Sequence, residues 1–502
     1  MDEWDARPAS RLTDNVAAIA RLFPHVITEV AGEAGEPRMS VDFDLLQQEL
    51  SGELAQGSGE RYGLEWPGKR AAALVATTPP SAQLREAEDE SVDRASTRNV
   101  FIAGDNLEAL KLLRQTHAGS VKLIYIDPPY NTRNDFVYND DFGPSHAEWL
   151  SMMYPRLILA RDLLTDDGVG FVSIDGNEVA QLKLLLAEVF GARNVVATIV
   201  WVSNLKGRQI SGGGPAGTHE YILCFARNAD AVARFRGSAS DLHALMPAVY
   251  RRTAYPPKYD AKGPYVTKNE LYNTNSRFNE RTAPTMVFRI HYHPGTGEVR
   301  VTDIDDDTEF EGFVSALPHP NHRAGLHWHA WRWSRARVLA DHDELEFDVS
   351  GGILRIRTKV RDVDGMTLKD VVIGPSTMSG QRDLDDLGMH HLFDSPKPVA
   401  LLRTLIAVTT SGDDLVLDFF AGSGTTAQAV MEQNADDGAR RRFALVQLDE
   451  RTSPRSEAAA AGFATIADVT AERMRRAGKR LRSRSAGGHV DTGFRVFRLE
   501  PR

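Results

Sequence analysis

A short apolar run that ends abruptly constrains the fold of this chain more than any other feature. Residues 123–126 read Leu-Ile-Tyr-Ile, and Asp127, Pro128, Pro129 and Tyr130 follow directly. A continuous apolar run of this length is typical of a strand that is buried on both faces of a parallel sheet. Two prolines cannot continue a central strand, so the chain must turn there. The sequence therefore predicts an α/β sheet with a rigid loop at the carboxyl edge of one strand, where ligands of such sheets bind.

The predicted loop presents two hydrogen-bond acceptors and a flat ring. An exocyclic amine is a poor nucleophile because its lone pair is delocalised into the base, and two acceptors on its hydrogens favour a pyramidal, more nucleophilic nitrogen. The carboxylate of Asp127 and the carbonyl of Pro128 supply such a pair, and Pro129 restrains the loop. Tyr130 offers a face on which a base extruded from a duplex can stack. The alternative interpretation is a surface turn after a buried strand.

A second motif, nearly 300 residues further on, has the pattern of a nucleoside-binding turn. Residues 415–430 read as a short apolar strand, a turn that contains Gly422 and Gly424, and the start of a helix. Glycine permits a positive φ and close backbone approach, and Thr425 or Thr426 can cap the helix. The turn lacks the third glycine of the dinucleotide fingerprint, so phosphate binding is not favoured. The candidate cofactor contacts in this motif are Asp418, Phe420, Gly422, Gly424 and Thr425.

An acidic pair follows the next predicted strand. Residues 443–448 are mostly apolar, and Asp449 and Glu450 come directly after them. An acid after the second strand of a dinucleotide unit bonds to the ribose hydroxyls, although here the spacing is somewhat longer than the usual ~20 residues. The glycine turn and the acid together predict a nucleoside site.

The order of these motifs resembles that of amino-group DNA methyltransferases of the β arrangement, in which the catalytic motif precedes the S-adenosylmethionine motif. More narrowly, residues 104–110, 127–132, 134–142 and 219–223 look like the corresponding segments of modification subunits of type III restriction systems. The similarity covers most of the chain, from about residue 62 to residue 500. Because several separate motifs occur in one order, the resemblance is specific.

The resemblance implies a Rossmann-like methyltransferase fold with permuted motif order, an inserted β-containing target-recognition domain and a small N-terminal helical region. It also implies methyl transfer from S-adenosylmethionine to the N6 amino group of adenine in double-stranded DNA. Asp127 and the Pro128 carbonyl would polarise the amine, and Tyr130 would stack on the flipped base. Aspartate rather than serine at position 127 favours adenine by resemblance alone.

Two further cofactor contacts rest on the same resemblance. Asp105 follows a predicted strand at residues 99–103 and would reach the adenine of the cofactor. Aspartate is also a favoured helix cap, and the two roles can coexist. Lys397 precedes an apolar helix that lies beside the methionine end of the cofactor in the family, and a solvated lysine at a helix start is the alternative.

Shifts in composition divide the chain into four predicted segments. Residues 1–60 form the N-terminal helical region, because Val16, Ile19 and Leu22 recur at helical spacing. Residues 61–227 form the first half of the methyltransferase core. Residues 228–389 form the insert, which contains short alternating runs and a hairpin pattern around residues 351–359. Residues 390–502 form the second half of the core and a terminal strand.

Composition excludes some classes of site and leaves others open. The sequence has no apolar run of about 18 residues and begins with an acidic segment, so we expect a cytoplasmic protein. The single cysteine, Cys224, cannot form an internal disulfide, and the histidines between residues 319 and 329 lack the pattern of a metal site. A net charge of -10 still permits local phosphate binding. Residues 328–337 and 473–484 are the two candidate phosphate-binding runs. The alternative for the first is a core-anchoring tryptophan cluster with solvated arginines, and the alternative for the second is a solvated helix face.

Two functional alternatives stay open at this point. One is a methyltransferase that acts on the N4 amino group of cytosine or on RNA. The other is a DNA-recognition subunit that retains the fold without catalysis. The resemblance also leaves open a homodimer and assembly with a helicase and nuclease restriction subunit.

Overall fold

The computed structural model describes residues 16, 19–20, 26–31, 37–43, 46, 63–132, 145–207, 215–247, 257–322, 325–361, 366–484 and 490–502. The chain divides into two compact units, and the first combines residues 1–251 with residues 366–502. The second unit, residues 252–365, lies inside the predicted insert 228–389. The two ends of that segment therefore belong to the first unit.

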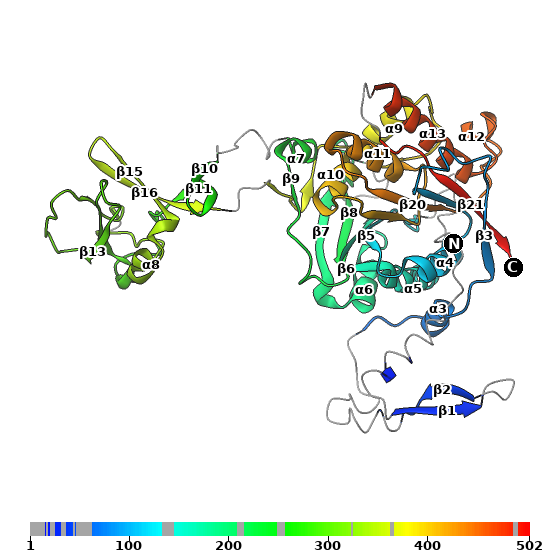
Figure 1. Cartoon of the computed structure of the whole chain (residues 1–502), viewed down its shortest axis with the longest axis horizontal. Helices are drawn as coiled ribbons and strands as arrows, with labels where there is room; N and C mark the ends of the chain where they lie inside the picture. The colour runs from blue at the N-terminus through cyan, green and yellow to red at the C-terminus, as the bar shows by residue number, and fades with distance from the viewer. Residues whose placement is uncertain are drawn as a thin grey trace. The chain divides into compact units, whose positions relative to one another are not determined.

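The described part of the first unit is built on a ten-stranded sheet (Figure 1). Its strands in spatial order are β18 (Val371–Val372), β7 (Val195–Trp201), β8 (Glu220–Ala226), β6 (Leu164–Ile174), β5 (Val121–Ile126), β19 (Leu415–Asp418), β20 (Arg442–Gln447), β4 (Val100–Ala103), β21 (Arg495–Pro501) and β3 (Ala82–Glu86).

The two motif strands are neighbours in this sheet although they are far apart in the sequence. β5 and β19 pair in parallel through Ile124 and Leu417, and β20 continues the parallel arrangement on the far side of β19. β8 runs antiparallel to both β6 and β7, so its first residue lies at the carboxyl edge of the parallel strands. The loop after β5, the turn after β19 and the start of β8 therefore share one edge.

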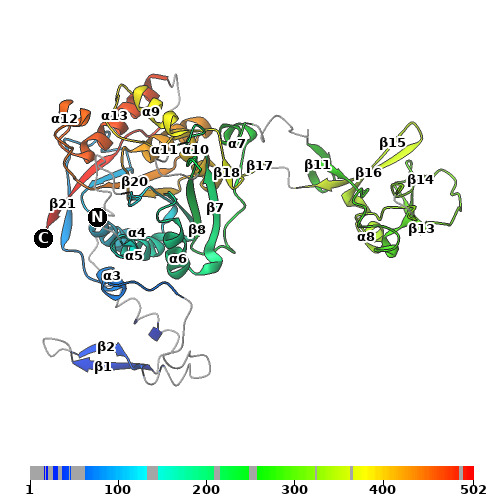
Figure 2. The ribbon, with the colours of Figure 1, turned by 180° about the vertical axis from the view of Figure 1, so that it is seen from behind.

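Helices cover both faces of the sheet (Figures 1 and 2). One face carries α4 (Asn106–His117), α5 (His146–Leu163) and α6 (Val179–Phe190), and the other carries α10 (Val399–Thr409), α11 (Thr425–Asp437) and α13 (Ile466–Arg484). Alternate residues of β5 enter the two cores, Ile124 on the first face and Leu123 on the second. Because both faces are buried, the apolar run of β5 is continuous. The predicted doubly covered α/β fold is confirmed.

Smaller elements complete the first unit. The helices are α3 (Lys69–Val75), α7 (Ala239–Leu245), α9 (Thr377–Asp385) and α12 (Glu457–Ala460), and β9 (Arg236–Gly237) pairs with β17 (Met366–Thr367). Cys224 is buried on β8, as expected of a small core residue. No helix in the described part of the chain is long and apolar enough to cross a membrane.

The N-terminal segment contains a hairpin that its helical spacing did not predict. β1 (Ile27–Ala31) and β2 (Pro37–Val41) pair antiparallel, with Ile27 opposite Val41. Residues 16, 19–20, 43 and 46 are helical. β-branched Ile27, Thr28 and Val30 favour a strand, and this preference was missed beside the stronger leucine pattern. Residues 26 and 42 are also described, and the remainder of residues 1–60 lies outside the described part.

The second unit has its own core and is rich in strands, as predicted for the insert. One sheet has the order β10 (Lys258–Asp260), β11 (Gly263–Glu270), β16 (Ile353–Val360) and β15 (Leu345–Ser350); the other has β13 (Val299–Asp303), β12 (Phe288–Tyr292) and β14 (Val314–Ala316). α8 (Arg335–Ala340) also belongs to this unit. Gly351 and Gly352, both with positive φ, form the two-residue turn of the predicted hairpin between β15 and β16.

The two basic runs are both engaged in packing. In the second unit, Trp331 is buried and its indole N–H donates to the Phe288 carbonyl. In the first unit, Arg473 on α13 is fully buried, and Arg476 donates to the Gly388 carbonyl. Neither run is simply a solvated charged face.

Candidate active site

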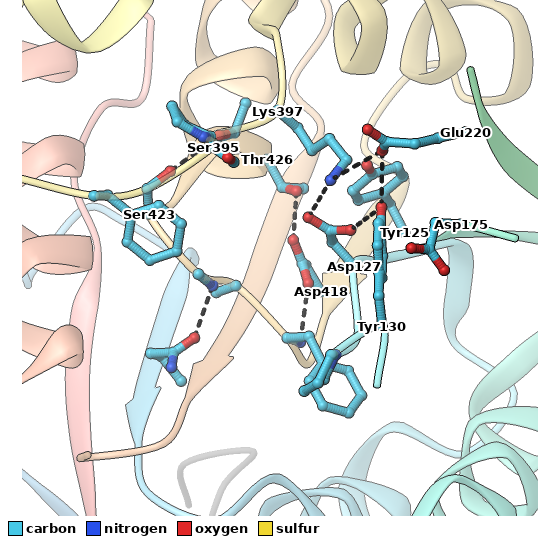
Figure 3. Close-up of a pocket in the computed structure, with 18 of the residues that line it drawn as sticks. Tyr125, Asp127, Tyr130, Asp175, Glu220, Ser395, Lys397, Asp418, Ser423 and Thr426 are labelled. Carbon is cyan, nitrogen blue, oxygen red and sulfur yellow. Dashed lines mark hydrogen bonds and ion pairs between the residues drawn. The ribbon is translucent and has the colours of Figure 1, made fainter. Parts of the chain in front are cut away.

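A cavity of about 1000 Å³ lies at the carboxyl edge of β5, β19 and β20 (Figure 3). Most of the residues selected from the sequence line it, although they come from segments far apart in the chain. They are Asp105, Asp127, Pro129, Tyr130, Lys397, Asp418, Phe420, Gly422, Thr425, Asp449 and Glu450. Pro128 and Gly424 are not among the lining residues. The residues 134–142 that contributed to the resemblance lie outside the described part of the chain.

Four polar side chains meet at the end of β5 (Figure 3). The Tyr130 hydroxyl lies 2.9 Å from Asp127 Oδ1 and 3.1 Å from Glu220 Oε2, and can donate its proton to either. Lys397 Nζ donates to Asp127 Oδ2 at 2.7 Å and lies 3.8 Å from Glu220 Oε2. The loop after β5, the start of β8 and the segment before α10 thus form one network.

Burial and charge act in opposite directions on Lys397. Its side chain is 10% exposed. Burial alone would lower the pKa of Lys397, but the charges of Asp127 and Glu220 outweigh it and the pKa is raised. The ammonium also lies 5.0 Å from the centre of the Tyr130 ring and 5.8 Å from that of Trp201. Lys397 is therefore held as a cation against the loop after β5, whereas the sequence suggested only a cofactor contact or a solvated side chain.

The loop itself is fixed by contacts behind the cavity. The indole N–H of fully buried Trp149 on α5 donates to the Pro129 carbonyl at 2.8 Å. Asn131 adopts a φ of 58°, and its amide donates to Glu178 Oε1 at 2.8 Å. Asparagine tolerates this left-handed conformation better than most residues. Burial and the nearby Asp127 charge raise the pKa of Tyr130 well above its usual value, so its hydroxyl stays protonated.

Asp418 is the last residue of β19, and its carboxyl group is buried. It accepts from the Phe420 backbone N–H at 3.0 Å and from the Thr426 hydroxyl at 2.5 Å. Burial raises the pKa of Asp418 to about 7, although both hydrogen bonds act to lower it. Gly424, not a threonine, is the residue before α11, and Thr425 and Thr426 lie inside the helix without capping it. The predicted threonine cap is wrong because Gly424 occupies the position before α11, so both threonines fall within the first turn of the helix.

The two glycines of the turn have different tasks. Gly422 has a φ of 52°, lines the cavity and donates its N–H to Gln447 Oε1 at 2.7 Å. Gly424 has a φ of 83°, and a Cβ there would lie 3.2 Å from the Thr470 carbonyl on α13. Gly422 therefore shapes the cavity wall, and Gly424 lets the turn pack against a helix. Both positions favour glycine because of their positive φ.

Asp105 caps a helix, which is one of the two roles considered from the sequence, and it also lies at the cavity. Its Oδ1 accepts from the backbone N–H groups of Leu107 and Glu108 and so caps α4. Its Oδ2 lies 3.3 Å from the Arg156 guanidinium, and the carboxylate also lines the cavity. The adjacent Asn106 donates to the Phe419 carbonyl at 2.7 Å and joins α4 to the turn after β19.

Several side chains of the site were not predicted from the sequence. Glu220 appeared only within the family resemblance, and Gln447 and Trp149 were given no role. A signal for Glu220 was present, since this acid begins β8 and the strand residues after it, 221–226, are apolar. Asp449 and Glu450, which were selected from the sequence, line the cavity after Leu448, just beyond the end of β20.

Comparison with known proteins identifies the family. Residues 121–450 match the model of the DNA methylase family. The chain is 33% identical to the Mod subunit of the type III restriction-modification enzyme EcoPI of Escherichia phage P1, over 88% of this chain and 71% of that protein. It is 31% identical to the EcoP15I Mod subunit of Escherichia coli, over 88% and 72%.

A third relative is the type II methyltransferase M.KpnI of Klebsiella pneumoniae, at 29% identity over 76% of this chain and 87% of that protein. The matches to the two Mod subunits extend over most of the chain, and the family model covers both motif strands together with the segment between them. The chain thus belongs to the DNA methylase family, in the branch that contains the Mod subunits of type III restriction-modification enzymes.

Proposed function

We propose that this protein transfers a methyl group from S-adenosylmethionine to the N6 amino group of adenine in double-stranded DNA, as the modification subunit of a restriction-modification system. One observation carries the proposal: the acceptor loop after β5 and the glycine turn after β19 line the same cavity. A loop suited to an amine and a turn suited to a nucleoside are the two halves of a methyl-transfer site.

The residues of the cavity fit S-adenosylmethionine. Asp449 and Glu450 offer carboxylates to ribose hydroxyls, and Asp105 offers one to the amino group of the cofactor adenine. The backbone at Gly422 permits close approach, and Phe420 and Thr425 complete the assigned wall. Lys397, which bonds to Asp127 in the cavity, would contact the methionine end of the cofactor. When bound, the cofactor supplies an electrophilic methyl group.

The residues of the catalytic loop act on the substrate amine. Asp127 and the Pro128 carbonyl accept its two hydrogens and favour the pyramidal nucleophile, while Pro129 restrains the loop. Tyr130 provides the stacking face for the flipped base. Because Trp149 and Glu178 hold the loop from behind, these acceptors are positioned before the substrate arrives.

The remaining parts of the proposal concern DNA selection and assembly. The segment 228–389, which contains the second compact unit, is proposed to recognise the target sequence. Double-stranded DNA in the cytoplasm is the substrate. A restriction subunit is the proposed partner, and a second copy of the chain is the proposed dimer partner.

Nucleoside analysis of methylated DNA tests this function. The purified protein is incubated with labelled S-adenosylmethionine and unmethylated genomic DNA, and the product nucleosides are separated. We expect N6-methyladenine, and none from Asp127→Ala. N4-methylcytosine would contradict the adenine assignment. DNA binding without methyl transfer would contradict the proposed enzymatic activity. In a parallel reaction with RNA, labelling of RNA and not of DNA would contradict DNA as the substrate.

A further inference from the structure

The charge balance at the end of β5 points to a role for a residue outside the assigned site. Asp127 and Glu220 contribute two carboxylates and Lys397 one ammonium, so the three groups carry a formal net charge of -1. All three side chains are largely buried, with exposed fractions of 27%, 13% and 10% respectively. In a buried site such charges act more strongly than at the surface.

Without Glu220, Lys397 would cancel the charge of Asp127. Lys397 Nζ donates to Asp127 Oδ2 at 2.7 Å, and the Tyr130 hydroxyl donates to Asp127 Oδ1 at 2.9 Å. Both donors therefore compete with a substrate amine for the same carboxylate. Glu220 Oε2 is the second acceptor within reach of both, at 3.8 Å from Nζ and 3.1 Å from the hydroxyl.

The proposed reaction makes this charge balance important. As the N6 lone pair forms the new bond to the methyl carbon, the carbon–sulfur bond breaks and its electron pair stays on sulfur. The positive charge passes to N6 until an N–H bond breaks and the proton leaves to the Asp127 carboxylate. A cluster of net negative charge stabilises the cationic nitrogen, whereas a neutral ion pair stabilises it far less.

We infer that Glu220 is a positioning residue for methyl transfer: it shares Lys397 and the Tyr130 hydroxyl with Asp127 and keeps the cluster at net negative charge. This inference rests on the proposed function. The fold explains how Glu220 reaches the site, because β8 runs antiparallel to β6 and its first residue lies beside the end of β5. Trp201, which pairs with Glu220 across β7 and β8, packs over Lys397 from the same edge.

Single-turnover methyl transfer at saturating cofactor and DNA tests the inference. Glu220→Gln keeps the shape and an acceptor for Tyr130 but removes the charge, so we expect the rate to fall about 10- to 100-fold. The double variant Glu220→Gln with Lys397→Met restores one uncompensated carboxylate and a net charge of -1. We expect it to be faster than Glu220→Gln alone. A purely structural role of Glu220 predicts the opposite, because the two losses would then multiply.

Binding measurements separate catalysis from folding. A duplex carries 2-aminopurine in place of the target adenine, at the site found by modification-aware sequencing, and its fluorescence reports base extrusion. We expect Glu220→Gln to retain the fluorescence increase and its affinity for S-adenosylmethionine while the rate falls. Loss of either binding signal, or a wild-type rate, would overturn the inference.

The matched control is Glu188→Gln. Glu188 on α6 also contacts a lysine and a tyrosine, at 2.7 Å from Lys69 and 3.2 Å from the Tyr154 hydroxyl, but it does not line the cavity. We expect its rate to equal that of the wild type. If the wild type makes N4-methylcytosine, the adenine proposal fails while the charge test still holds, since that amine also becomes cationic. The two failures are therefore distinguishable.

Discussion

Asp418 and Thr426 meet behind the glycine turn, where the threonine hydroxyl lies 2.5 Å from the buried carboxyl group. The first residue of this pair ends β19 and the second lies in the first turn of α11. The bond therefore ties the strand to the helix across the turn that is proposed to hold the cofactor. Because Asp418 is 2% exposed, its ionisation is costly and must affect stability.

The free energy of unfolding should fall as the pH rises, because the buried Asp418 carboxyl group then ionises. Its folded pKa is about 7, against an unfolded value of about 3.9. Between these two pKa values the folded state keeps the Asp418 proton that the unfolded state loses. The contribution of the protonated carboxyl group to stability is therefore fully present below about pH 4 and is lost as the pH rises through about 7. Between pH 5.5 and 7.5 the loss is about 2 kcal/mol.

Asp418→Asn should remove this dependence. We expect the stability of the variant relative to wild type to improve by about 2 kcal/mol between pH 5.5 and 7.5, measured by urea unfolding at each pH. Asp413→Asn, on the exposed turn before β19, is the control and should show no such trend. An unchanged difference between Asp418→Asn and wild type across this range would contradict the prediction.

The sequence predicted the two halves of the cavity because each carries a local signal. Apolar runs that end at Asp127 and Asp418 identify central strands, and prolines or glycines after them identify turns. These signals depend on residues close together in the chain. The order of the two motifs then permitted the fold to be inferred from the family resemblance.

The rest of the site depends on contacts that no local pattern contains. Glu220 carries a local signal as an acid at the start of an apolar strand, but only the antiparallel pairing of β8 brings it to the cavity. Lys397 was expected near the cofactor, yet its direct partner is Asp127, 270 positions away. The threonine cap failed for a different reason: Gly424, with a φ of 83°, takes the position before α11, and the two threonines lie one and two residues further in.

Removing the support of the loop after β5, which is proposed to be catalytic, should lower the methylation rate by more than the loss of stability explains. Trp149→Phe keeps an aromatic ring but leaves the Pro129 carbonyl without its donor. We expect a stability loss of about 1 to 3 kcal/mol, by urea unfolding. We also expect the methylation rate per folded molecule to fall about tenfold, because the acceptor loop is less well positioned.

Trp66→Phe is the matched control for this loop. Trp66 belongs to the same hydrophobic core, and its indole N–H donates to the Ser151 hydroxyl rather than to the loop. Its stability should fall to a similar or smaller extent, with normal methylation per folded molecule. Equal loss of activity in both variants would argue that the Trp149 bond has no special role.

The glycine turn should be sensitive to an added methyl group. Gly424→Ala introduces a Cβ 3.2 Å from the Thr470 carbonyl at a φ of 83°. We expect it to destabilise the protein by about 1 to 3 kcal/mol and to weaken S-adenosylmethionine binding about tenfold or more. Thermal unfolding and isothermal titration calorimetry measure the two effects.

Gly438→Ala separates backbone strain from damage to the turn. Gly438 ends the same helix with a φ of 73°, and a Cβ there would meet nothing within 4 Å. This variant should lose about 1 kcal/mol of stability and bind the cofactor normally. If both variants bound the cofactor equally well, Gly424 would not support the cofactor site.

Arg473 should control the shape of the turn from behind. Its guanidinium is fully buried and donates through Nη1 to the hydroxyls of Ser423 and Thr425, both at 2.6 Å, and through Nε to Gln428 at 2.9 Å. Burial lowers the pKa of Arg473 to about 10, so it remains a cation at neutral pH. Its bonds link α13 to both sides of Gly424.

Arg473→Met should therefore weaken cofactor binding more than it slows chemistry. The side chain keeps its apolar stem, but two hydroxyls of the turn lose their donor, so we expect the Kd for S-adenosylmethionine to rise about tenfold while the single-turnover rate at saturation changes less than threefold. Arg476 lies three positions further along α13 and contacts Glu472 and the carbonyls of Leu387 and Gly388 rather than the turn, so Arg476→Met should bind the cofactor normally. A saturating rate that falls as far as the affinity would place Arg473 in catalysis rather than in positioning the turn.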